Sequence, residues 1–289
     1  MTETGEPLSL PKRQLGYYLR QAREEAGMTL AEAAAHIGRS APTLMRVERG
    51  LTQKLSLPEI EAYCRLYQFD PAKIEAMKGL AQQANTKNWW HEYGDLIPAD
   101  FDVYVGLETA AQEIATYQPD LIPGLLQTPD YARALMQSAL PDDPPDEIER
   151  RVGLKIRRQQ LILRRVRPAA LQLIIHEGAI RRVVGSGKVM GSQVRYLADM
   201  STRTNIEIRI LPFTAGIPLG DPVGAFVMLR FGDDAHTVVY VETFTGDLYL
   251  EKPASARRYA DAYGAIQSAA LDAATSRATL RQVAKEHSR

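Results

Sequence analysis

The chain has few of the residues that build disulfide bonds, metal sites or membrane spans. Cys64 is the only cysteine among 289 residues, which excludes an internal disulfide and any metal site with several cysteine ligands. No apolar run approaches the roughly 18 residues that indicate a transmembrane helix. Residues 1–7 are acidic and polar, unlike a signal peptide. We therefore expect a cytoplasmic protein without a membrane partner.

Residue patterns of known catalytic and cofactor sites are also scarce. The five histidines show no i, i+4 pair around a helical glutamate, and no Gly-x-Ser-x-Gly elbow is present. The run Gly-Ser-Gly-Lys at 185–188 fails as a phosphate loop because Arg182 and Val189 occupy the other required positions. Glu177 and Glu242 fall near expected strand ends, where a lone carboxylate is usually a surface residue. We predict no enzyme activity, no metal site and no cofactor.

The charges that are present lie unevenly along the chain. The 35 Lys and Arg residues balance the 35 Asp and Glu residues. Residues 1–87 hold 12 basic and 10 acidic side chains, whereas residues 88–145 hold 1 basic and 10 acidic ones. Residues 146–167 hold 8 basic and 3 acidic side chains, and residues 168–289 hold 14 basic and 12 acidic ones. Overall neutrality therefore does not exclude a nucleic-acid partner, because charge must be assessed domain by domain.

The first 85 residues predict five helices. Thr29 and Glu32 form a capping box before the second helix, and Ser40 caps a third helix that ends at Gly50. Ser56 and Glu59 predict another capping box, and Asp70 followed by proline opens a fifth helix that runs to about residue 86. The connection at 38–40 has the length of the turn in a helix-turn-helix.

The segment LGYYLRQAREEAGMTLAEAAAHIGRSAPTLMRVERG, residues 15–50, resembles the DNA-binding domain of Xre-type helix-turn-helix regulators. The ordered match includes Arg20 and Arg23, the Gly-Met-Thr turn, Leu-Ala-Glu, and a serine-capped helix that ends in Val-Glu-Arg-Gly. The resemblance implies that the third helix enters the major groove of DNA. The alternative is a structural five-helix module that has lost its DNA contacts.

We expect Arg46 to read a base, since a guanidinium can bond guanine O6 and N7 together. Thr43 and Ala41 could contact a thymine methyl group or the backbone, and helix N-termini commonly bind phosphate. Arg49 could instead pair with Glu48 or with the end of its own helix. The predicted DNA-binding residues are Thr29, Arg39, Ser40, Ala41, Thr43, Arg46, Arg49 and Lys54. Because one such domain contacts a half-site, we expect a homodimer on a near-palindromic operator.

The remainder of the chain predicts a larger α+β domain with a mixed or mainly antiparallel sheet of about five strands. The expected strands cover residues 171–176, 206–211, 224–231, 237–242 and 247–250. The expected helices cover residues 129–139, 146–165, 192–202 and 254–285. We assign residues 1–10 to a disordered tail, 11–70 to the helix-turn-helix domain, 71–92 to a linker helix and junction, and 93–289 to the effector and dimerisation domain.

The segment YQPDLIPGLLQTPDYARALM, residues 117–136, is similar to the C-terminal domain of the actinobacterial WhiJ-like regulators. That resemblance implies an effector domain behind an Xre-type N-terminus. Members of that family are described as antitoxin-like and commonly sit beside a gene for a small partner protein. The candidate ligand or partner residues are Trp89, Trp90, Tyr117, Leu125, Gln127 and Tyr131.

Two segments permit alternative interpretations. The tryptophan pair could line a pocket, or it could pack at the domain junction, which we favour. The basic helix at 146–167 could contact DNA phosphates, or it could pair with the acidic segment at 88–145, which we also favour.

Together these features predict a sequence-specific DNA-binding regulator, a repressor, whose second domain dimerises and binds a small protein or small molecule. The alternative is an antitoxin-like protein that sequesters a small partner and binds DNA only for autoregulation.

Overall fold

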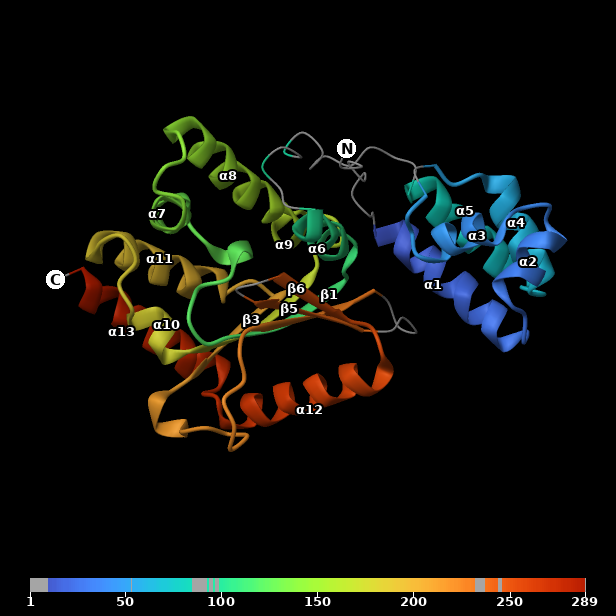
Figure 1. The fold of residues 1–289 in the computed structure, drawn as a ribbon. Coiled ribbons are helices and arrows are strands. Elements are labelled where there is room, and N and C mark those ends of the chain that lie inside the picture. Colours follow the sequence, from blue (N-terminus) through green and yellow to red (C-terminus); the bar gives the residue numbers. More distant parts are fainter. Residues whose placement is uncertain are drawn as a thin grey trace. The chain divides into compact units, whose positions relative to one another are not determined.

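The computed structural model describes residues 10–52, 54–84, 93, 96, 99–231, 237–243 and 246–288. The chain forms two compact units, residues 1–107 and 108–289, and the boundary falls inside helix α6 (Ala99–Ala110). Figure 1 shows the elements of each unit. Of the predicted tail, residues 1–9 lie outside the described residues, and residue 10 begins the first helix.

The first unit contains the five predicted helices. They are α1 (Leu10–Glu25), α2 (Leu30–His36), α3 (Ala41–Glu48), α4 (Leu57–Leu66) and α5 (Pro71–Ala84). The capping box of Thr29 and Glu32 is present, and Ser40 caps α3 by accepting from the Thr43 N–H. The predicted box of Ser56 and Glu59 is wrong, because Ser56 makes no side-chain cap and Glu59 pairs with Arg39 at 3.3 Å.

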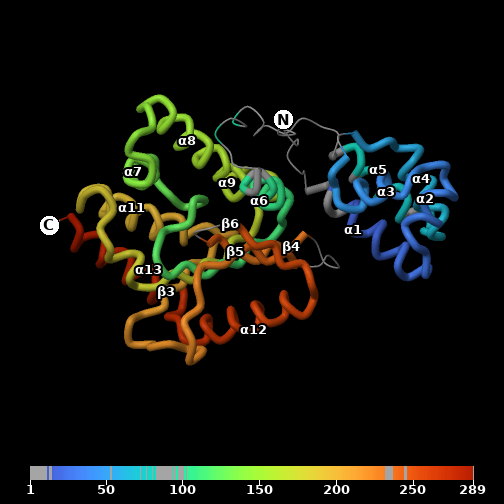
Figure 2. Tube along the Cα trace, viewed as in Figure 1, coloured from blue at the N-terminus to red at the C-terminus, as the bar shows by residue number. Residues whose placement is uncertain are grey.

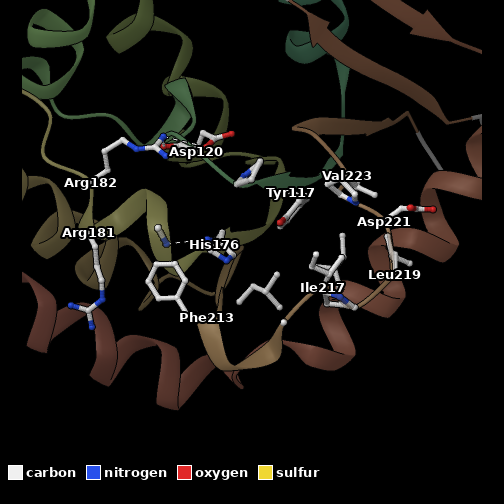
Figure 3. A pocket seen from close by; sticks show the side chains of 17 residues that line it. Tyr117, Asp120, His176, Arg181, Arg182, Phe213, Ile217, Leu219, Asp221 and Val223 are labelled. Carbon is white, nitrogen blue, oxygen red and sulfur yellow. Dashed lines mark hydrogen bonds and ion pairs between the residues drawn. The ribbon is translucent and has the colours of Figure 1, made fainter.

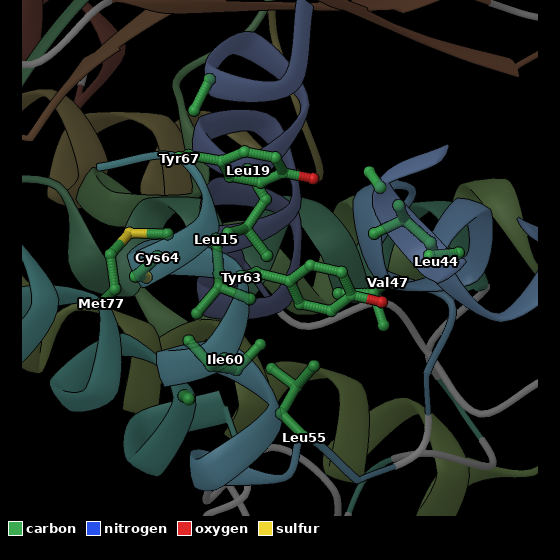
Figure 4. Packing of buried hydrophobic residues seen from close by; sticks show 14 residues of the cluster. Leu15, Leu19, Leu44, Val47, Leu55, Ile60, Tyr63, Cys64, Tyr67 and Met77 are labelled. Atoms are coloured by element: carbon green, nitrogen blue, oxygen red, sulfur yellow. The ribbon is translucent and has the colours of Figure 1, made fainter. Parts of the chain in front are cut away.

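All five helices of this unit contribute to one apolar core (Figure 4). The fully buried members include Leu15 and Leu19 of α1, Leu44 of α3 and Tyr63 of α4. Met77, from α5, is also buried in this core, and α5 packs against α1 and α4. Helix α5 is therefore part of the bundle rather than the linker helix that we expected.

A buried ion pair joins α1 to α3. Arg23 donates from Nε to Glu48 Oε1 at 2.6 Å and from Nη2 to Glu48 Oε2 at 2.9 Å. Its Nη1 also donates to the Met28 carbonyl oxygen at 2.9 Å, on the turn before α2. The hydrogen bond to Glu48 raises the pKa of Arg23. One guanidinium thus ties together α1, the turn and α3.

The second unit is built on a six-stranded mixed sheet of order β3-β2-β1-β4-β5-β6. The strands are β1 (Glu113–Gln118), β2 (Ala170–His176), β3 (Ile206–Leu211), β4 (Phe226–Arg230), β5 (Val238–Thr243) and β6 (Gly246–Leu250). Strands β1, β2 and β3 are parallel, and β4, β5 and β6 continue the sheet in antiparallel pairs. This confirms the predicted α+β fold class, with β1 as a strand that sequence analysis missed.

Helices cover this sheet, as expected for a sheet that contains parallel strands. They are α7 (Pro129–Ala139), α8 (Pro145–Arg158), α9 (Gln160–Leu163), α10 (Glu177–Arg181), α11 (Gly187–Met200), α12 (Pro253–Ala269) and α13 (Ala273–His287), with 3-10 turns η2 (Gly124–Leu126) and η3 (Phe213–Ala215). Figure 2 shows α12 crossing one face of the sheet. Helices α11 and α13 run beside each other, and α13 packs against β3. Tyr263 and Ile266 of α12 pack on Tyr117 and Phe226 of the strands.

Three of the expected helix boundaries are wrong. The segment at 146–165 is divided into α8 and α9, and the segment at 254–285 is divided into α12 and α13 because Asp272 caps a new helix. Helix α11 begins at Gly187 rather than Ser192, since the Ser186 side chain accepts from the Val189 N–H. The run at 185–188 is therefore a helix cap.

The α12–α13 junction also protects the edge of the sheet. Leu271 donates its N–H to the Ile210 carbonyl oxygen at 2.9 Å, and the Ile210 N–H donates to Ser276 Oγ at 3.0 Å. An unpaired strand edge would offer these groups to another chain. The break between the two helices thus covers part of edge strand β3.

Candidate nucleic-acid interface

Helices α2 and α3 form a helix-turn-helix with a tight connection. Gly38 takes a φ of 67°, a conformation that glycine adopts readily, and its N–H donates to the Ala35 carbonyl oxygen. The Arg39 N–H donates to the Ala34 carbonyl oxygen at 2.8 Å. Ala33 and Ala34 are fully buried, so small side chains allow α3 to approach α2 closely.

Helix α3 presents one polar face to solvent. Pro42, Arg46 and Arg49 are exposed at positions i, i+4 and i+7, while Leu44 and Val47 are buried on the opposite side. Ala41 is half-buried. The exposed stripe therefore carries two guanidinium groups along a helix of 8 residues.

The cations around α3 differ in how they are paired. Arg46, Arg49 and Lys54 are exposed, and within the described part of the chain none of their side chains has a hydrogen bond or ion pair. Arg39, by contrast, contacts Glu59. Glu48 is occupied by Arg23, so the expected alternative of an Arg49–Glu48 pair is wrong. Three unpaired positive charges are thus exposed in α3 and the segment that follows it.

The hydroxyl groups at the two helix starts are already engaged. The Ser40 and Thr43 oxygens lie 2.8 Å apart, and Ser40 Oγ also accepts from the Thr43 N–H at 3.4 Å. The Glu32 carboxylate accepts from both the Thr29 N–H and the Thr29 hydroxyl at 2.8 Å. These bonds set the direction of α2 and α3, and contacts from Thr29, Ser40 and Thr43 to DNA stay predictions.

Three of the six predicted ligand or partner residues are interior residues that offer no surface. Leu125, Gln127 and Tyr131 are 4%, 3% and 0% exposed, so they offer no binding surface. The Gln127 amide donates to the Ile122 carbonyl oxygen at 2.7 Å and shapes the turn before α7. The proline- and glycine-rich sequence therefore builds a packed loop. Trp89 and Trp90 lie outside the described residues.

Tyr117 is the exception among these candidates, because it lines a pocket in the second unit. The other residues around that pocket were not proposed from the sequence. They come from segments that are far apart along the chain, and no local motif marks them.

The basic segment at 146–167 pairs within its own unit. Arg158 makes two hydrogen bonds of 2.7 Å to Glu108 in the interior, and Arg151 contacts Asp143 at 3.2 Å. Both carboxylates belong to the acidic segment at 88–145. These contacts favour the predicted internal pairing over a role in binding DNA phosphates.

Within the described ranges no group of three or more His, Cys, Asp or Glu side chains could hold a metal ion. None of the helices there is long and apolar enough to span a bilayer. Cys64 is buried, and burial raises the pKa of its thiol to about 11, which makes it a poor ligand or nucleophile at neutral pH.

Comparison with known families assigns both units. A family described as helix-turn-helix domain matches residues 14–77, which include α2 and α3. A family described as domain of unknown function, DUF5753, matches residues 101–282, more than half of the chain. The chain belongs to the DUF5753 family. No curated protein and no solved structure matches this DUF5753 chain significantly. The helix-turn-helix match indicates a DNA-binding regulator, whereas the finer Xre-type and WhiJ-like resemblances stay predictions.

Proposed function

We propose that this DUF5753-family protein is a sequence-specific transcriptional regulator that reads DNA with α3. The observation that carries the proposal is the exposed, unpaired pair Arg46 and Arg49 on a short capped helix. An α-helix fits the major groove of DNA, and arginine is the commonest reader of guanine there. The buried Arg23–Glu48 pair holds α3 against α1, so the orientation of α3 is set before it binds the groove.

The two arginines have different expected roles. Arg46 lies in the middle of the exposed face, where a reading side chain would meet base edges. Arg49 is the C-cap residue, at the end of the helix where the chain turns away. We therefore assign base contact to Arg46 and phosphate contact to Arg49, with Lys54 adding a further charge toward the backbone.

The length of α3 supports binding as a dimer. Its 8 residues span about 12 Å at about 1.5 Å per residue, which covers only a few base pairs. One such half-site gives little specificity, and two related by a twofold axis give a near-palindromic operator. We assign dimerisation and an effector response to the second unit. Occupation of a promoter by such a dimer would block transcription, so we expect repression.

Replacement of Arg46 by alanine tests the proposal. On duplex DNA selected by the wild-type protein, R46A should bind roughly ten- to a hundredfold more weakly, since a bidentate base contact contributes about 1–3 kcal/mol. It should also lose its preference at one position of each half-site. Fluorescence anisotropy with the selected duplex and with single-base variants measures both effects.

Arg65 provides a matched control. It is an exposed arginine on α4 that pairs with Glu61 at 2.6 Å, away from the α3 stripe. R65A should bind DNA like the wild type, and R49A should weaken binding to all sequences alike and reduce its salt dependence. If R46A keeps both the affinity and the base preference of the wild type, α3 does not read DNA as proposed.

A further inference from the structure

The second unit contains a pocket of about 670 Å³ at the carboxyl ends of its parallel strands (Figure 3). Tyr117 is the last residue but one of β1, His176 ends β2 and Leu211 ends β3, and all three line it. The chain between β3 and β4 closes the other side with Phe213, Ile217 and Val223. Ligands of sheets with parallel strands bind at this edge, and the volume suits a small molecule.

The inner wall of the pocket holds a phenol hydroxyl without a partner. Tyr117 is only 7% exposed, and its hydroxyl bonds to no other group in the described part of the chain. Figure 3 shows this side chain facing the middle of the pocket. This hydroxyl is not among the fully buried polar atoms, so it is open to the cavity and can donate to a ligand there.

His176 adds a second free donor. Its Nδ1 accepts from the Gly178 N–H at 3.0 Å, so the neutral ring carries its proton on Nε2. That Nε2–H has no partner among the described residues. The imidazole and Phe213 rings are in T-shaped contact, with a centroid distance of 5.1 Å. Two donors, one phenol and one imidazole, therefore line the same pocket as this apolar ring.

Much of the remaining lining is apolar, and both of its arginines are paired. Phe213 and Ile217 are 56% and 61% exposed, a large apolar surface that a ligand would cover. Arg182 contacts Asp120 at 3.2 Å and Arg181 contacts Glu177 at 2.6 Å, whereas Asp221 has no ion pair within the described residues. A lining without an unpaired cation does not favour a highly charged anion such as a polyphosphate.

We propose that this pocket binds an apolar small molecule whose carbonyl or carboxylate oxygen accepts hydrogen bonds from the Tyr117 hydroxyl and the His176 Nε2–H. This inference rests on the proposed function, because the pocket would be the site at which the second unit binds its effector. Its test does not depend on DNA.

The test compares two probes of equal chain length on the full-length protein. Decanoate carries acceptor oxygens, whereas decyltrimethylammonium carries a cation and no acceptor. Isothermal titration calorimetry should show saturable 1:1 binding of decanoate and at least tenfold weaker binding of decyltrimethylammonium. Y117F should weaken decanoate binding roughly three- to tenfold, since it removes one hydrogen bond and leaves the ring in place.

Ile217 and Val183 are aliphatic residues of similar exposure, and substitution of each by aspartate gives a matched pair of variants. I217D places a carboxylate on the pocket wall and should weaken decanoate binding at least tenfold. V183D makes a similar change at a residue that is 60% exposed and does not line the pocket, so it should bind like the wild type. Absence of saturable decanoate binding, equal affinity for the two probes, or wild-type affinity in both Y117F and I217D would overturn the proposal.

The R46A variant separates this site from the DNA-binding function. It should bind decanoate like the wild type, because the substitution lies in the other unit. If R46A and the wild type bind the probe equally but neither binds specific DNA, the proposed function fails and the pocket stands. If specific DNA binding is normal but decanoate does not bind, the pocket assignment fails alone.

Discussion

Single residues decide how the reading helix is held. Arg23 and Glu48 are 25 positions apart in the sequence, and both belong to the segment that resembles Xre-type regulators. No local pattern pairs them, because α1 itself carries two acidic side chains beside Arg23, those of Glu24 and Glu25. Their contact requires the approach of α1 to α3, which exists only in the folded domain.

Removal of one member of this pair should be costly. R23M leaves Glu48 buried without a partner, and we expect a loss of about 3–5 kcal/mol of unfolding free energy. R23M/E48M should recover most of that loss, since both charges are gone. Urea unfolding followed by circular dichroism measures the difference.

The exposed pair of Arg20 and Glu24 provides the comparison for that series. Its side chains are 61% and 52% exposed, so R20M should cost less than about 1 kcal/mol. An R23M variant as stable as R20M would contradict the assigned role of the buried pair.

Lys155 of α8 predicts a dependence of stability on pH. Burial lowers the pKa of its ammonium from an ordinary 10.5 to about 8, and the nearby Arg158 adds to this shift. Below about pH 8 the side chain is charged in the folded and the unfolded chain, so folding bears the full cost of burying the charge. Between about pH 8 and pH 10.5 the folded chain loses the proton first, and stability rises.

K155M should therefore stabilise the protein at pH 7. Because Lys155 keeps some exposed surface, we expect about 2 kcal/mol, less than the shift alone would give. The gain should shrink as the pH rises from about 8 to 10.5. Unfolding midpoints in urea measured at pH 7, 8.5 and 10 test this. A variant that is less stable than the wild type at pH 7 would contradict it.

At the scale of elements, close approach between α1 and α3 depends on one glycine. A Cβ added at Gly16 would lie 2.5 Å from the Glu48 carbonyl oxygen and 2.6 Å from that of Val47. G16A should therefore force the two helices apart, and we expect a loss of roughly 1–3 kcal/mol. Weaker DNA binding should accompany it, because α3 would move.

Gly79 supplies an internal control of opposite sign. It lies inside α5, and an added Cβ there would meet no atom within 4 Å. G79A should stabilise the protein by about 0.5–1 kcal/mol, since alanine favours a helix interior more than glycine does. Thermal unfolding of both variants measures the pair of effects. Destabilisation of the two variants by the same amount would show that close packing at Gly16 is not the cause.

Some elements could be predicted from the sequence, and others could not. The helices around the turn at 38–40 follow from local caps and an apolar period of three or four residues. Strand β1 was missed because it is bounded by Glu113 and Gln118, so its apolar part is short. Its position depends on pairing with β2 and β4, which begin more than 50 residues later.

Capping patterns were reliable only where no other partner competed. Thr29 and Glu32 form the expected box, whereas Glu59 turns to Arg39 and leaves Ser56 without a side-chain cap. The cap at Asp272 was overlooked because the surrounding alanines are good helix formers and conceal the break. The tertiary contact of Glu59 with Arg39 accounts for the missing cap at Ser56. The break before Asp272 lets Leu271 and Ser276 bond to the edge strand β3.

At the scale of the whole molecule, each of the two units offers one candidate site. The α3 stripe could be predicted, because it lies within one short segment that resembles a known domain. The pocket could not, because its walls come from β1, β2, β3 and the chain that follows β3. Tyr117 was proposed from the sequence because it begins the proline- and glycine-rich segment at 117–127. In the structure it lines the pocket because it lies near the carboxyl end of strand β1.

The oligomeric state is a prediction at this scale. We expect native mass spectrometry of the protein from its own host to show a dimer of twice 32.2 kDa. An additional mass of several kilodaltons would favour the antitoxin-like alternative with a small protein partner. A monomer at micromolar concentration, both with and without DNA, would contradict binding as a dimer.

The most direct test of the central claim is selection of binding sites from random duplex DNA by the full-length protein. We predict enrichment of an inverted repeat with half-sites about one helical turn apart, each with a guanine whose enrichment disappears in R46A. Binding without any enriched sequence, or an enriched sequence unchanged in R46A, would contradict the claim that α3 reads DNA through Arg46.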